Sequence, residues 1–253
     1  MTASDLQRIA AFRMSFARRQ AAVVSEIPGG VVVLDEGFTR SHEHNQLVIG
    51  GPTAPGRLVA LADEALGHLP HRQIMVLDDA VAAECAPALT AAGYTHYTET
   101  VMTHSGTVTG PTGAPAEPVT LAELRPELVR QLRSWMPQAG DDVIHQLADR
   151  RTVRLRGADQ VRFLAVRAPD GTVASWADLY LEPGQDIAQI EEVVTADAHT
   201  RNGYADTVVA TALRQAAGYG LFFLIADPDD WPRTWYARRG FTAIGRSHRF
   251  SRT

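Results

Sequence analysis

The fold of this chain is decided by the stretch Glu191-Glu192-Val193-Val194-Thr195-Ala196-Asp197-Ala198-His199-Thr200-Arg201-Asn202-Gly203-Tyr204-Ala205. Its acidic, β-branched beginning predicts a strand, and the spacing of the apolar residues that follow predicts a helix over 204–217. The first N–H groups of such a helix lack an intrahelical acceptor, and the helix dipole favours negative charge there. The stretch therefore predicts a phosphate-binding turn, although an ordinary connection capped by His199 or Thr200 would use the same residue types.

Composition bounds the class of protein. The 253 residues suffice for one large or two small domains, and a net charge of -5 does not favour nucleic acid or an anionic membrane as a partner. No apolar run approaches the roughly 18 residues of a membrane span. The single cysteine, Cys85, excludes an intramolecular disulfide and fits a reducing compartment, so we expect a cytoplasmic location.

A segment rich in glycine, proline and threonine, 107–117, predicts a linker between two halves, 1–106 and 118–253. In the first half the expected helices are 4–24, 57–67 and 79–92, and the expected strands are 30–34, 45–49, 73–77 and 95–103. In the second half the expected helices are 125–135, 141–150, 204–217 and 231–238, and the expected strands are 118–121, 161–167, 173–181, 186–195, 221–226 and two short final ones. An antiparallel hairpin that feeds a β-α-β-α-β unit predicts a mixed α/β sheet.

Residues 188–217 resemble the acyl-CoA-binding motif of the GNAT family of N-acetyltransferases, whose turn reads Arg/Gln-x-x-Gly-x-Gly/Ala. Gly203 and Ala205 match the last two fixed positions, whereas Thr200 stands at the first position and Arg201 follows it. The resemblance covers 118–253 well and the first half only as a degenerate copy. It implies two tandem GNAT-like halves with a mostly antiparallel central sheet flanked by helices, and a catalytic domain in the second half.

The resemblance also implies acetyl-CoA as the co-substrate. It assigns cofactor contacts to the strand end, the turn and the helix start: Val193, Val194, Thr195, Thr200, Arg201, Asn202, Gly203, Tyr204 and Ala205. Backbone groups of Val193 and Thr195 would pair with the pantetheine arm as if it were another strand. An amide of that strand would also polarise the thioester carbonyl.

The segment 229–241, in which Tyr236 precedes Gly240-Phe241, resembles a second hallmark of the family. The resemblance implies that Tyr236 donates a proton to the departing thiolate. The family usually carries asparagine six residues before this tyrosine, and here Asp230 stands in that position, so we expect a cofactor contact from Asp230. From spacing alone, Tyr236 also suits the buried face of an amphipathic helix.

Two adjacent glutamates, Glu191 and Glu192, point to opposite faces of their strand. An amine acceptor is protonated at neutral pH and has to lose a proton before it attacks, and a carboxylate can take that proton. The family's usual base corresponds to Glu191, but the family's strand contains a bulge that shifts the register. The sequence leaves Glu191, Glu192 or neither as the base. Trp176 and Asp178, on the neighbouring strand, either line the site or lie on a solvated hairpin edge.

The resemblance implies an N-acyltransferase that moves an acetyl group from acetyl-CoA to an amine by direct attack in a ternary complex. The expected acceptor is a small-molecule amine or a peptide N-terminus, and the expected state is a monomer or homodimer without nucleic-acid or membrane partners. The alternative is a non-catalytic acyl-CoA sensor or structural module, which Thr200 and Asp230 motivate. Another nucleotide-binding α/β enzyme is disfavoured by the absence of Gly-x-Gly-x-x-Gly.

Two features of the first half are expected to bind neither cofactor nor metal. The loop 50–56 takes the place of the phosphate turn, but its two prolines remove amide donors. His42 and His44 share a face, but no third ligand stands near them in the sequence, so we expect a surface turn and no metal.

Overall fold

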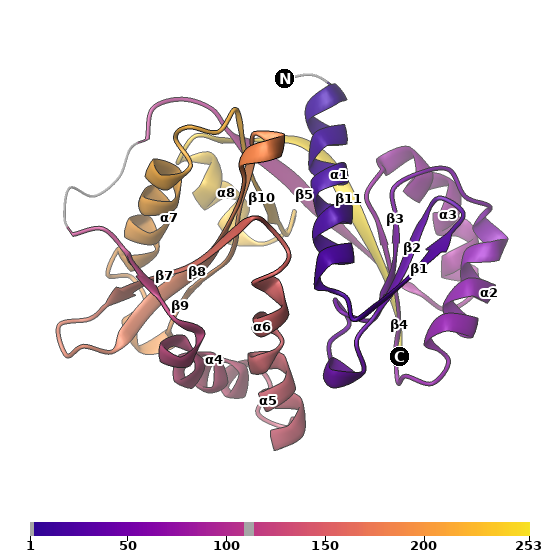
Figure 1. Cartoon of the computed structure of the whole chain (residues 1–253), viewed down its shortest axis with the longest axis horizontal. Helices are drawn as coiled ribbons and strands as arrows, with labels where there is room; N and C mark the ends of the chain where they lie inside the picture. Colours follow the sequence, from indigo (N-terminus) through magenta and orange to yellow (C-terminus); the bar gives the residue numbers. More distant parts are fainter. Residues whose placement is uncertain (1–2, 109–113) are drawn as a thin grey trace. The chain divides into compact units, whose positions relative to one another are not determined.

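The computed structural model describes residues 3–108 and 114–253 (Figure 1). By their packing the residues form two compact units, which we describe one at a time. Unit 1 contains the chain up to Met102, Ile225–Ala237 and Thr242–Thr253, and unit 2 contains Thr103–Leu224 and Arg238–Phe241. Residues 109–113 of the predicted linker lie outside the described residues.

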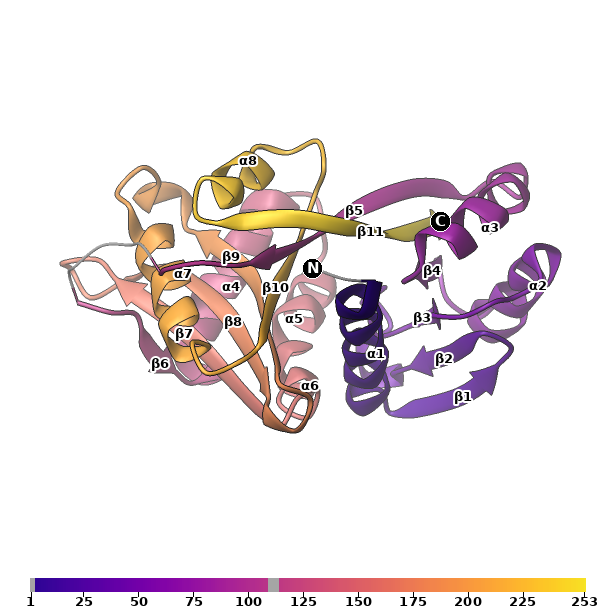
Figure 2. The ribbon, with the colours of Figure 1, turned by 90° about the horizontal axis from the view of Figure 1, so that it is seen from above.

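Unit 1 is an open sheet with helices on both faces (Figure 2). Its elements are α1 (Ala3–Gln20), β1 (Val23–Ile27), β2 (Gly30–Leu34), β3 (Gln46–Ile49), α2 (Pro55–Leu66), β4 (Arg72–Val76), α3 (Asp79–Ala91), β5 (Thr95–His104), α8 (Trp231–Ala237) and β11 (Phe241–Arg252), with a 3-10 turn at Glu36–Phe38. The strand order is β1-β2-β3-β4-β11-β5. The β3–β4 pair is parallel, and the pairs β1–β2, β2–β3 and β4–β11 are antiparallel.

Alternation along the central strands explains the two covered faces of this sheet. On one face Val31, Val33 and Val48 pack against α1 residues such as Met14 and Ala17. On the other face the neighbouring strand residues join a larger core with α2 and α3, which contains Val32, Leu47, Ile49, Leu58, Ala62, Leu66, Ile74, Val76, Ala82, Cys85 and Leu89. Consecutive apolar residues in a strand therefore reflect burial on both sides.

Unit 2 has the same layered character. Its elements are β6 (Glu117–Val119), α4 (Leu121–Trp135), α5 (Asp141–Asp149), α6 (Arg151–Arg154), β7 (Gln160–Arg167), β8 (Val173–Glu182), β9 (Ile187–Thr195), α7 (Tyr204–Gln215) and β10 (Leu221–Ala226), with 3-10 turns at Pro183–Gln185 and Asp197–His199. The strand order is β10-β9-β8-β7-β6, and only the β9–β10 pair is parallel among the pairs of this unit.

The middle strand of unit 2, β8, is buried at every position, so both faces of the sheet are covered. Helices α4 and α5 contribute Leu124, Leu128 and Ala148 to a core with Phe163 and Trp176. Helix α7 packs against β7, β8 and β9 and covers the other face (Figures 1 and 2). The predicted mixed α/β architecture, with a mostly antiparallel sheet flanked by helices, is confirmed.

Three predictions about the secondary structure were wrong. The first helix stops at Gln20, because the β-branched Val23 and Val24 pair with β2 as an edge strand. The short helix α6 was missed. One strand, β11, replaces the two short final strands, and Gly245 lies inside it without breaking it. A Cβ on Gly245 would lie 2.6 Å from Leu6 of α1, so this glycine permits a close approach of the helix.

The predicted domain limits, 1–106 and 118–253, stay a prediction, because the two units are defined by contacts between residues and do not test where one domain ends along the chain. The described part of the chain contains no helix that is both long enough and apolar enough to cross a membrane.

Candidate active site

The strand β9 leaves its parallel neighbour β10 partway along its length. The two strands pair from Leu221–Ile187 to Phe223–Gln189, whereas β9 continues to Thr195 beside β8. Along this second part the β9 edge toward β10 has no strand partner in the described chain. Unpaired backbone groups at such an edge are a template for an extended ligand that adds as a strand.

The same part of β9 contains a bulge. Asp178 of β8 pairs with Glu191 and Trp176 pairs with Val194, so Glu192 and Val193 both lie opposite Ala177. Glu192 adopts a φ of 53°, in the left-handed region that a side chain with a Cβ rarely occupies. The bulge changes which face each glutamate presents, which alternation alone could not predict.

The strand end is bonded to β8 by side chains as well as by backbone. Ser175 Oγ donates to the Val194 carbonyl at 2.7 Å, and Thr195 Oγ1 donates to Ser175 Oγ at 3.1 Å. Trp176, expected either to line the site or to lie on a solvated hairpin edge, has an exposed fraction of 1% and packs into the core of unit 2. Val194 is partly buried against that same core, so the side chains of this strand end serve packing while its far backbone edge lacks a strand partner.

The turn after β9 opens α7 with amides that point out of the helix. Gly203 precedes the helix with a φ of 76° and no side-chain cap, and a Cβ added to it would meet no described atom within 4 Å. Arg201 also has a positive φ, 65°. Left-handed residues in a turn direct successive N–H groups into one concavity, which suits an anion. Among the described residues, the N–H groups of Gly203, Tyr204 and Ala205 have no hydrogen-bond acceptor.

The side chains of the turn bond within the turn itself. Thr200 Oγ1 donates to the Asp197 carbonyl at 3.2 Å, and Asn202 Nδ2 donates to the His199 carbonyl at 3.2 Å. The Tyr204 ring meets the His199 ring edge-on at 6.1 Å. Thr200 therefore stabilises the turn where the family's motif has a longer polar side chain.

A cluster of charged groups lies at the bulge, and its cations were not predicted from the sequence. Arg151 and Arg154 of α6 are 4% and 1% exposed, and Asp178 of β8 is fully buried. Burial lowers the pKa of Arg151, but the carboxylates of Asp178 and Glu192 outweigh it and raise this pKa above its ordinary value. Long charged side chains are expected at the surface, so only the spacing of three positions between two arginines, which puts both on one helix face, could have pointed to them.

The two candidate bases differ in how the arginines engage them. Glu192 Oε2 accepts from Arg151 at 2.9 Å, and Glu192 Oε1 accepts from Arg154 at 3.2 Å. Arg150 Nη2 also lies 3.5 Å from Glu192 Oε1. Glu191 Oε2 lies 3.7 Å from Arg154 Nη1, outside hydrogen-bond distance, and its side chain is more exposed, 33% against 24%. Asp178, expected at the site or on a solvated edge, is instead the buried centre of the cluster.

The first turn of α7 also bears a carboxylate. Arg239 Nε donates to Asp206 Oδ1 at 2.6 Å, and both residues belong to unit 2. The positive charge of Arg239 thereby neutralises an acidic group beside the free amides of α7. Gly240 follows with a φ of 88°, where it ends the α8 segment.

Tyr236 and Asp230 belong to unit 1, and the structure describes them there. Tyr236 is buried in α8, 8% exposed, and its ring lies 5.0 Å from that of Trp235. Asp230 Oδ1 accepts from the Trp231 N–H at 2.7 Å at the start of α8. The predicted roles of both residues stay predictions.

The corresponding turn of unit 1 is built differently. The N–H groups of Gly50 and Gly51 both donate to the Gly29 carbonyl, at 2.9 Å and 3.0 Å, and α2 begins with Pro55, which has no N–H. These two amides are therefore already bonded, and a third is missing; that the loop 50–56 binds no CoA stays a prediction.

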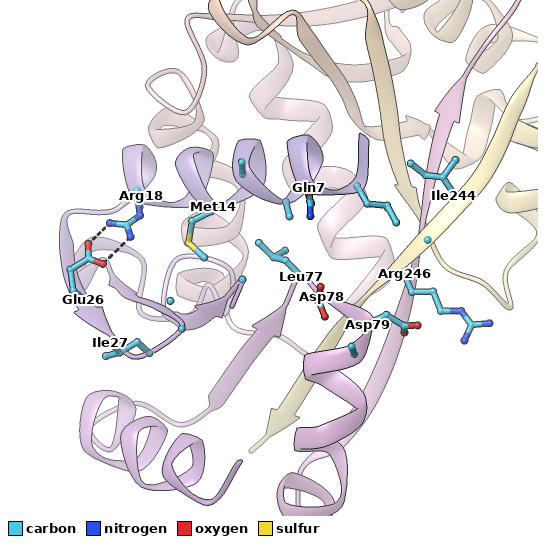
Figure 3. Close-up of a pocket in the computed structure, with 18 residues that line it drawn as sticks. Gln7, Met14, Arg18, Glu26, Ile27, Leu77, Asp78, Asp79, Ile244 and Arg246 are labelled. Carbon is cyan, nitrogen blue, oxygen red and sulfur yellow. Dashed lines mark hydrogen bonds and ion pairs between the residues drawn. The ribbon is translucent and has the colours of Figure 1, made fainter. Parts of the chain in front are cut away.

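Unit 1 nevertheless contains a cavity of about 970 Å³, at the carboxyl ends of the parallel strands β3 and β4 and under α1 (Figure 3). Met14 and Leu77 supply apolar wall, and Arg18 and Glu26 form an ion pair at one end. A crevice at the carboxyl ends of parallel strands is a common position for ligand sites in α/β sheets.

The histidine segment 41–45 is not a surface turn. Ser41, His44 and Asn45 are buried, and His44 bonds to Ser41 Oγ at 2.7 Å through Nδ1 and to Gln20 Oε1 at 3.0 Å through Nε2. The prediction failed because partners far apart in sequence satisfy these polar groups. No group of three or more histidine, cysteine, aspartate or glutamate side chains arranged for a metal ion occurs in the described residues.

The chain is similar to known proteins in sequence and in fold. The model of the acetyltransferase (GNAT) family matches residues 123–241. Two solved structures are similar to the chain in fold. One is a functionally unknown conserved protein from Staphylococcus epidermidis, with 10% identity and a TM-score of 0.65, and the match covers 90% of this chain and 92% of that chain. The other is a GCN5-related N-acetyltransferase from Kribbella flavida, with 16% identity and a TM-score of 0.64, and the match covers 97% of this chain and 94% of that chain. A tandem GNAT protein from the clavulanic acid biosynthesis pathway is 15% identical, with a TM-score of 0.53 and coverage of 98% and 94%.

At these identities the structures show the fold alone. No curated protein is significantly similar to the chain. The match of the family model spans the unpaired β9 edge, the turn at Gly203 and α7. Residues 123–241 therefore form a domain that matches the GNAT acetyltransferase family, and the fold of the chain is similar to that of a tandem GNAT protein.

Proposed function

We propose that the protein is an N-acetyltransferase that transfers the acetyl group of acetyl-CoA to an amine, and that the second half, 118–253, carries the reaction. The observation that supports this most is the unpaired β9 edge running directly into the free amides at Gly203. An extended pantetheine chain pairs with such an edge, and a pyrophosphate binds such amides. The predicted contacts are from Val193, Val194 and Thr195 of the strand and from the turn residues Thr200, Arg201, Asn202, Gly203, Tyr204 and Ala205.

The contrast between the two turns favours the second half as the catalytic one. In unit 1 the amides of Gly50 and Gly51 are already bonded to Gly29, whereas in unit 2 the amides of Gly203 and Tyr204 have no acceptor in the described chain. Hydrogen-bond donors that are aimed outward and pre-organised cost no reorganisation when an anion binds.

We assign the role of general base to Glu191. The two oxygens of Glu192 already accept from Arg151 and Arg154, so this carboxylate would lose those bonds on taking a proton. Glu191 has a longer contact, 3.7 Å to Arg154, and a more exposed side chain. A carboxylate with accessible oxygens takes a proton from an incoming ammonium directly or through one water.

The proposed reaction transfers the acetyl group from sulfur to nitrogen. Glu191 accepts a proton from the ammonium group of the acceptor, the amine nitrogen attacks the thioester carbonyl carbon, and a C–N bond replaces the C–S bond. The electron pair of the C–S bond leaves with sulfur, which then takes a proton. Tyr236 is the predicted donor of that proton, and Asp230 the predicted further cofactor contact. The attacking nitrogen, which is positively charged after the attack, loses its second proton, so the overall reaction releases one proton to solvent. The products are an acetylated amine and CoA.

The acceptor is a small-molecule amine or a peptide N-terminus, and we propose a cytoplasmic monomer or homodimer, as a single cysteine suits a reducing compartment. One observation favours the alternative function, a non-catalytic acyl-CoA sensor. Thr200 Oγ1 bonds within its own turn, so this chain offers no long side chain to the phosphates at that position. A protein that bound acetyl-CoA without turnover would fit that reading.

Calorimetry with acetyl-CoA, followed by thiol release against a panel of amines, tests the proposal. We expect saturable binding of one acetyl-CoA per chain and CoA release that depends on the amine. Absence of binding would overturn both the enzyme and the sensor. Binding without release on any small amine or peptide N-terminus would leave the sensor as the function.

A further inference from the structure

The buried arginines of α6 bond to both strands of the β9 bulge. Arg151 donates through Nη1 to Asp178 of β8 and through Nη2 to Glu192 of β9, the second contact at 2.9 Å. Arg154 repeats this arrangement, with Nη1 2.8 Å from Asp178 Oδ2 and Nη2 3.2 Å from Glu192 Oε1. We call these four residues the arginine clamp.

Tyr180 adds a neutral group to the arginine clamp. Its hydroxyl donates to Asp178 Oδ2 at 3.1 Å and accepts from Arg154 Nη1 at 3.1 Å. Tyr180 and Asp178 are both fully buried. The carboxylate at the centre therefore has defined partners, which fixes the position of both guanidinium groups.

Such a cluster is a poor way to gain stability. Two buried guanidinium groups lose their hydration, and replacing buried ion pairs by apolar residues of similar volume is often neutral or stabilising. What the arginine clamp supplies is geometry, because a planar guanidinium bridges two carboxylates at fixed angles. Its two carboxylates come from different strands: Asp178 of β8 lies opposite Glu191, next to the bulge, and Glu192 is one of the two bulge residues opposite Ala177.

The backbone at the bulge also needs a restraint. Glu192 has a φ of 53°, a conformation that disfavours side chains with a Cβ, and it persists where the surroundings determine it. In the described chain, Glu192 binds two arginines that are themselves buried and bonded to Asp178. The arginine clamp therefore holds Glu192 in that conformation.

We propose that Arg151 and Arg154 are positioning residues of the acyl transfer, which hold the β9 bulge so that Glu191 and the edge at Val193–Thr195 keep the register that the two substrates require. The inference rests on the proposed function. Neither arginine need contact a substrate. Their effect passes through Glu192 to its neighbours on both sides, Glu191 toward the amine and Val193 toward the pantetheine arm.

The test compares Arg151→Lys and Arg154→Lys with the wild-type protein. Lysine keeps the charge that neutralises Asp178, so the variants should fold, but an ammonium cannot reproduce the bidentate bridge. We expect kcat/KM to fall about 100-fold, with kcat lowered and KM for acetyl-CoA raised together, since small displacements of reacting groups have effects of this size. Arg125→Met, which breaks an exposed pair with Asp149, should leave both constants unchanged.

Hydrogen exchange supplies a readout independent of activity. In the lysine variants the amides of Val193–Thr195 should exchange faster, while the amides of β7 keep wild-type rates. If a lysine variant fails to fold, the charge-balanced double variant Arg151→Met/Glu192→Gln replaces it, with the same expected result.

The outcomes separate the two hypotheses. Folded variants with wild-type kcat, KM and exchange at Val193–Thr195 would overturn the positioning role. Uniformly faster exchange across unit 2 would also overturn it, because it indicates a general loss of stability. A wild-type protein that neither binds acetyl-CoA nor releases CoA overturns the proposed function instead, whatever the exchange pattern of the variants.

Discussion

Asp206 accepts a hydrogen bond of 2.6 Å from Arg239, which fixes a neutralised carboxylate in the first turn of α7. If a pyrophosphate binds at Gly203, the charge of Asp206 is close enough to matter, and Arg239 cancels it. Arg239→Met should weaken acetyl-CoA binding by about tenfold, since an unscreened like charge near the site costs on the order of 1 kcal/mol or more. Calorimetry at low and high salt measures this loss of affinity, which should be smaller at high salt because ions screen the repulsion.

The double variant Arg239→Met/Asp206→Asn is the matched control for this pair. It removes both charges and should restore most of the affinity. An equal loss in the single and double variants would show that Arg239 acts through packing and not through charge.

Gly203→Glu should abolish acetyl-CoA binding. The open space beside Gly203 accommodates the side chain, but its carboxylate would lie where we propose the pyrophosphate. Two negative groups about 5 Å apart repel by about 3 kcal/mol at an effective dielectric constant of 20, which predicts a loss of about 100-fold or more. Gly203→Ala has the same backbone strain at a φ of 76° without the charge, and it should bind much more tightly than Gly203→Glu. Equal affinities in the two variants would mean that the pyrophosphate lies elsewhere.

Glu191→Gln should lower kcat by roughly 10²–10⁴-fold and leave acetyl-CoA affinity unchanged, because it removes only the proton acceptor. The pH–rate profile of Glu191→Gln should lose its acidic limb, whereas Glu192→Gln should keep that limb. A profile that loses the limb only in Glu192→Gln would reverse the assignment of the base.

Tyr236→Phe should slow release of CoA by at least about 100-fold if its hydroxyl protonates the thiolate. The substitution keeps the buried ring and its contact with Trp235. Tyr94→Phe is the control, since the Tyr94 hydroxyl is buried in unit 1 with no hydrogen-bond partner among the described residues. Stopped-flow detection of thiol compares them, and equal rates for the two variants and the wild type would remove Tyr236 from the mechanism.

His71 should make stability fall with acidity. Burial, followed by the stacked ring of His42, lowers the pKa of His71 from 6.5 to about 4. The unfolded chain takes up a proton below about pH 6.5, while the folded chain resists protonation until about pH 4. Stability from this group is therefore complete at pH 7 and falls by about 2 kcal/mol between pH 7 and pH 5. Urea titrations at both pH values of wild type and His71→Gln, which lacks the titrating group, should show a steeper decline in the wild type.

Much of the fold was predictable from local patterns. Helical spacing located α7 and the strand run 221–226 located β10, and both lie as expected. The pairs Gly93-Tyr94 and Gly240-Phe241 have the same local conformation, because both glycines have a φ near 85° and both aromatic rings are buried. These features depend on residues close in sequence, which is why a single sequence contains them.

Other features depended on partners that a sequence does not reveal. The exposed edge strand β1 has no apolar face to mark it, and the continuity of β11 through Gly245 depends on Leu6 of a distant helix. The bulge is set by what lies opposite on β8, and the burial of Arg151 by Asp178, 27 positions along the chain. For this reason the sequence could name two glutamates but could not choose between them.

The place of β11 in unit 1 has a consequence for biosynthesis. This strand lies between β4 and β5 in the sheet order, and its residues His248–Arg252 pair with Val76–Arg72. A ribosome releases β4 and β5 long before it releases β11, so the sheet of unit 1 stays open in its middle until residues 241–252 have been made. During that interval the edges of β4 and β5 are without their final neighbour, and we expect nascent chains stalled before residue 241 to bind chaperones more strongly than the finished protein.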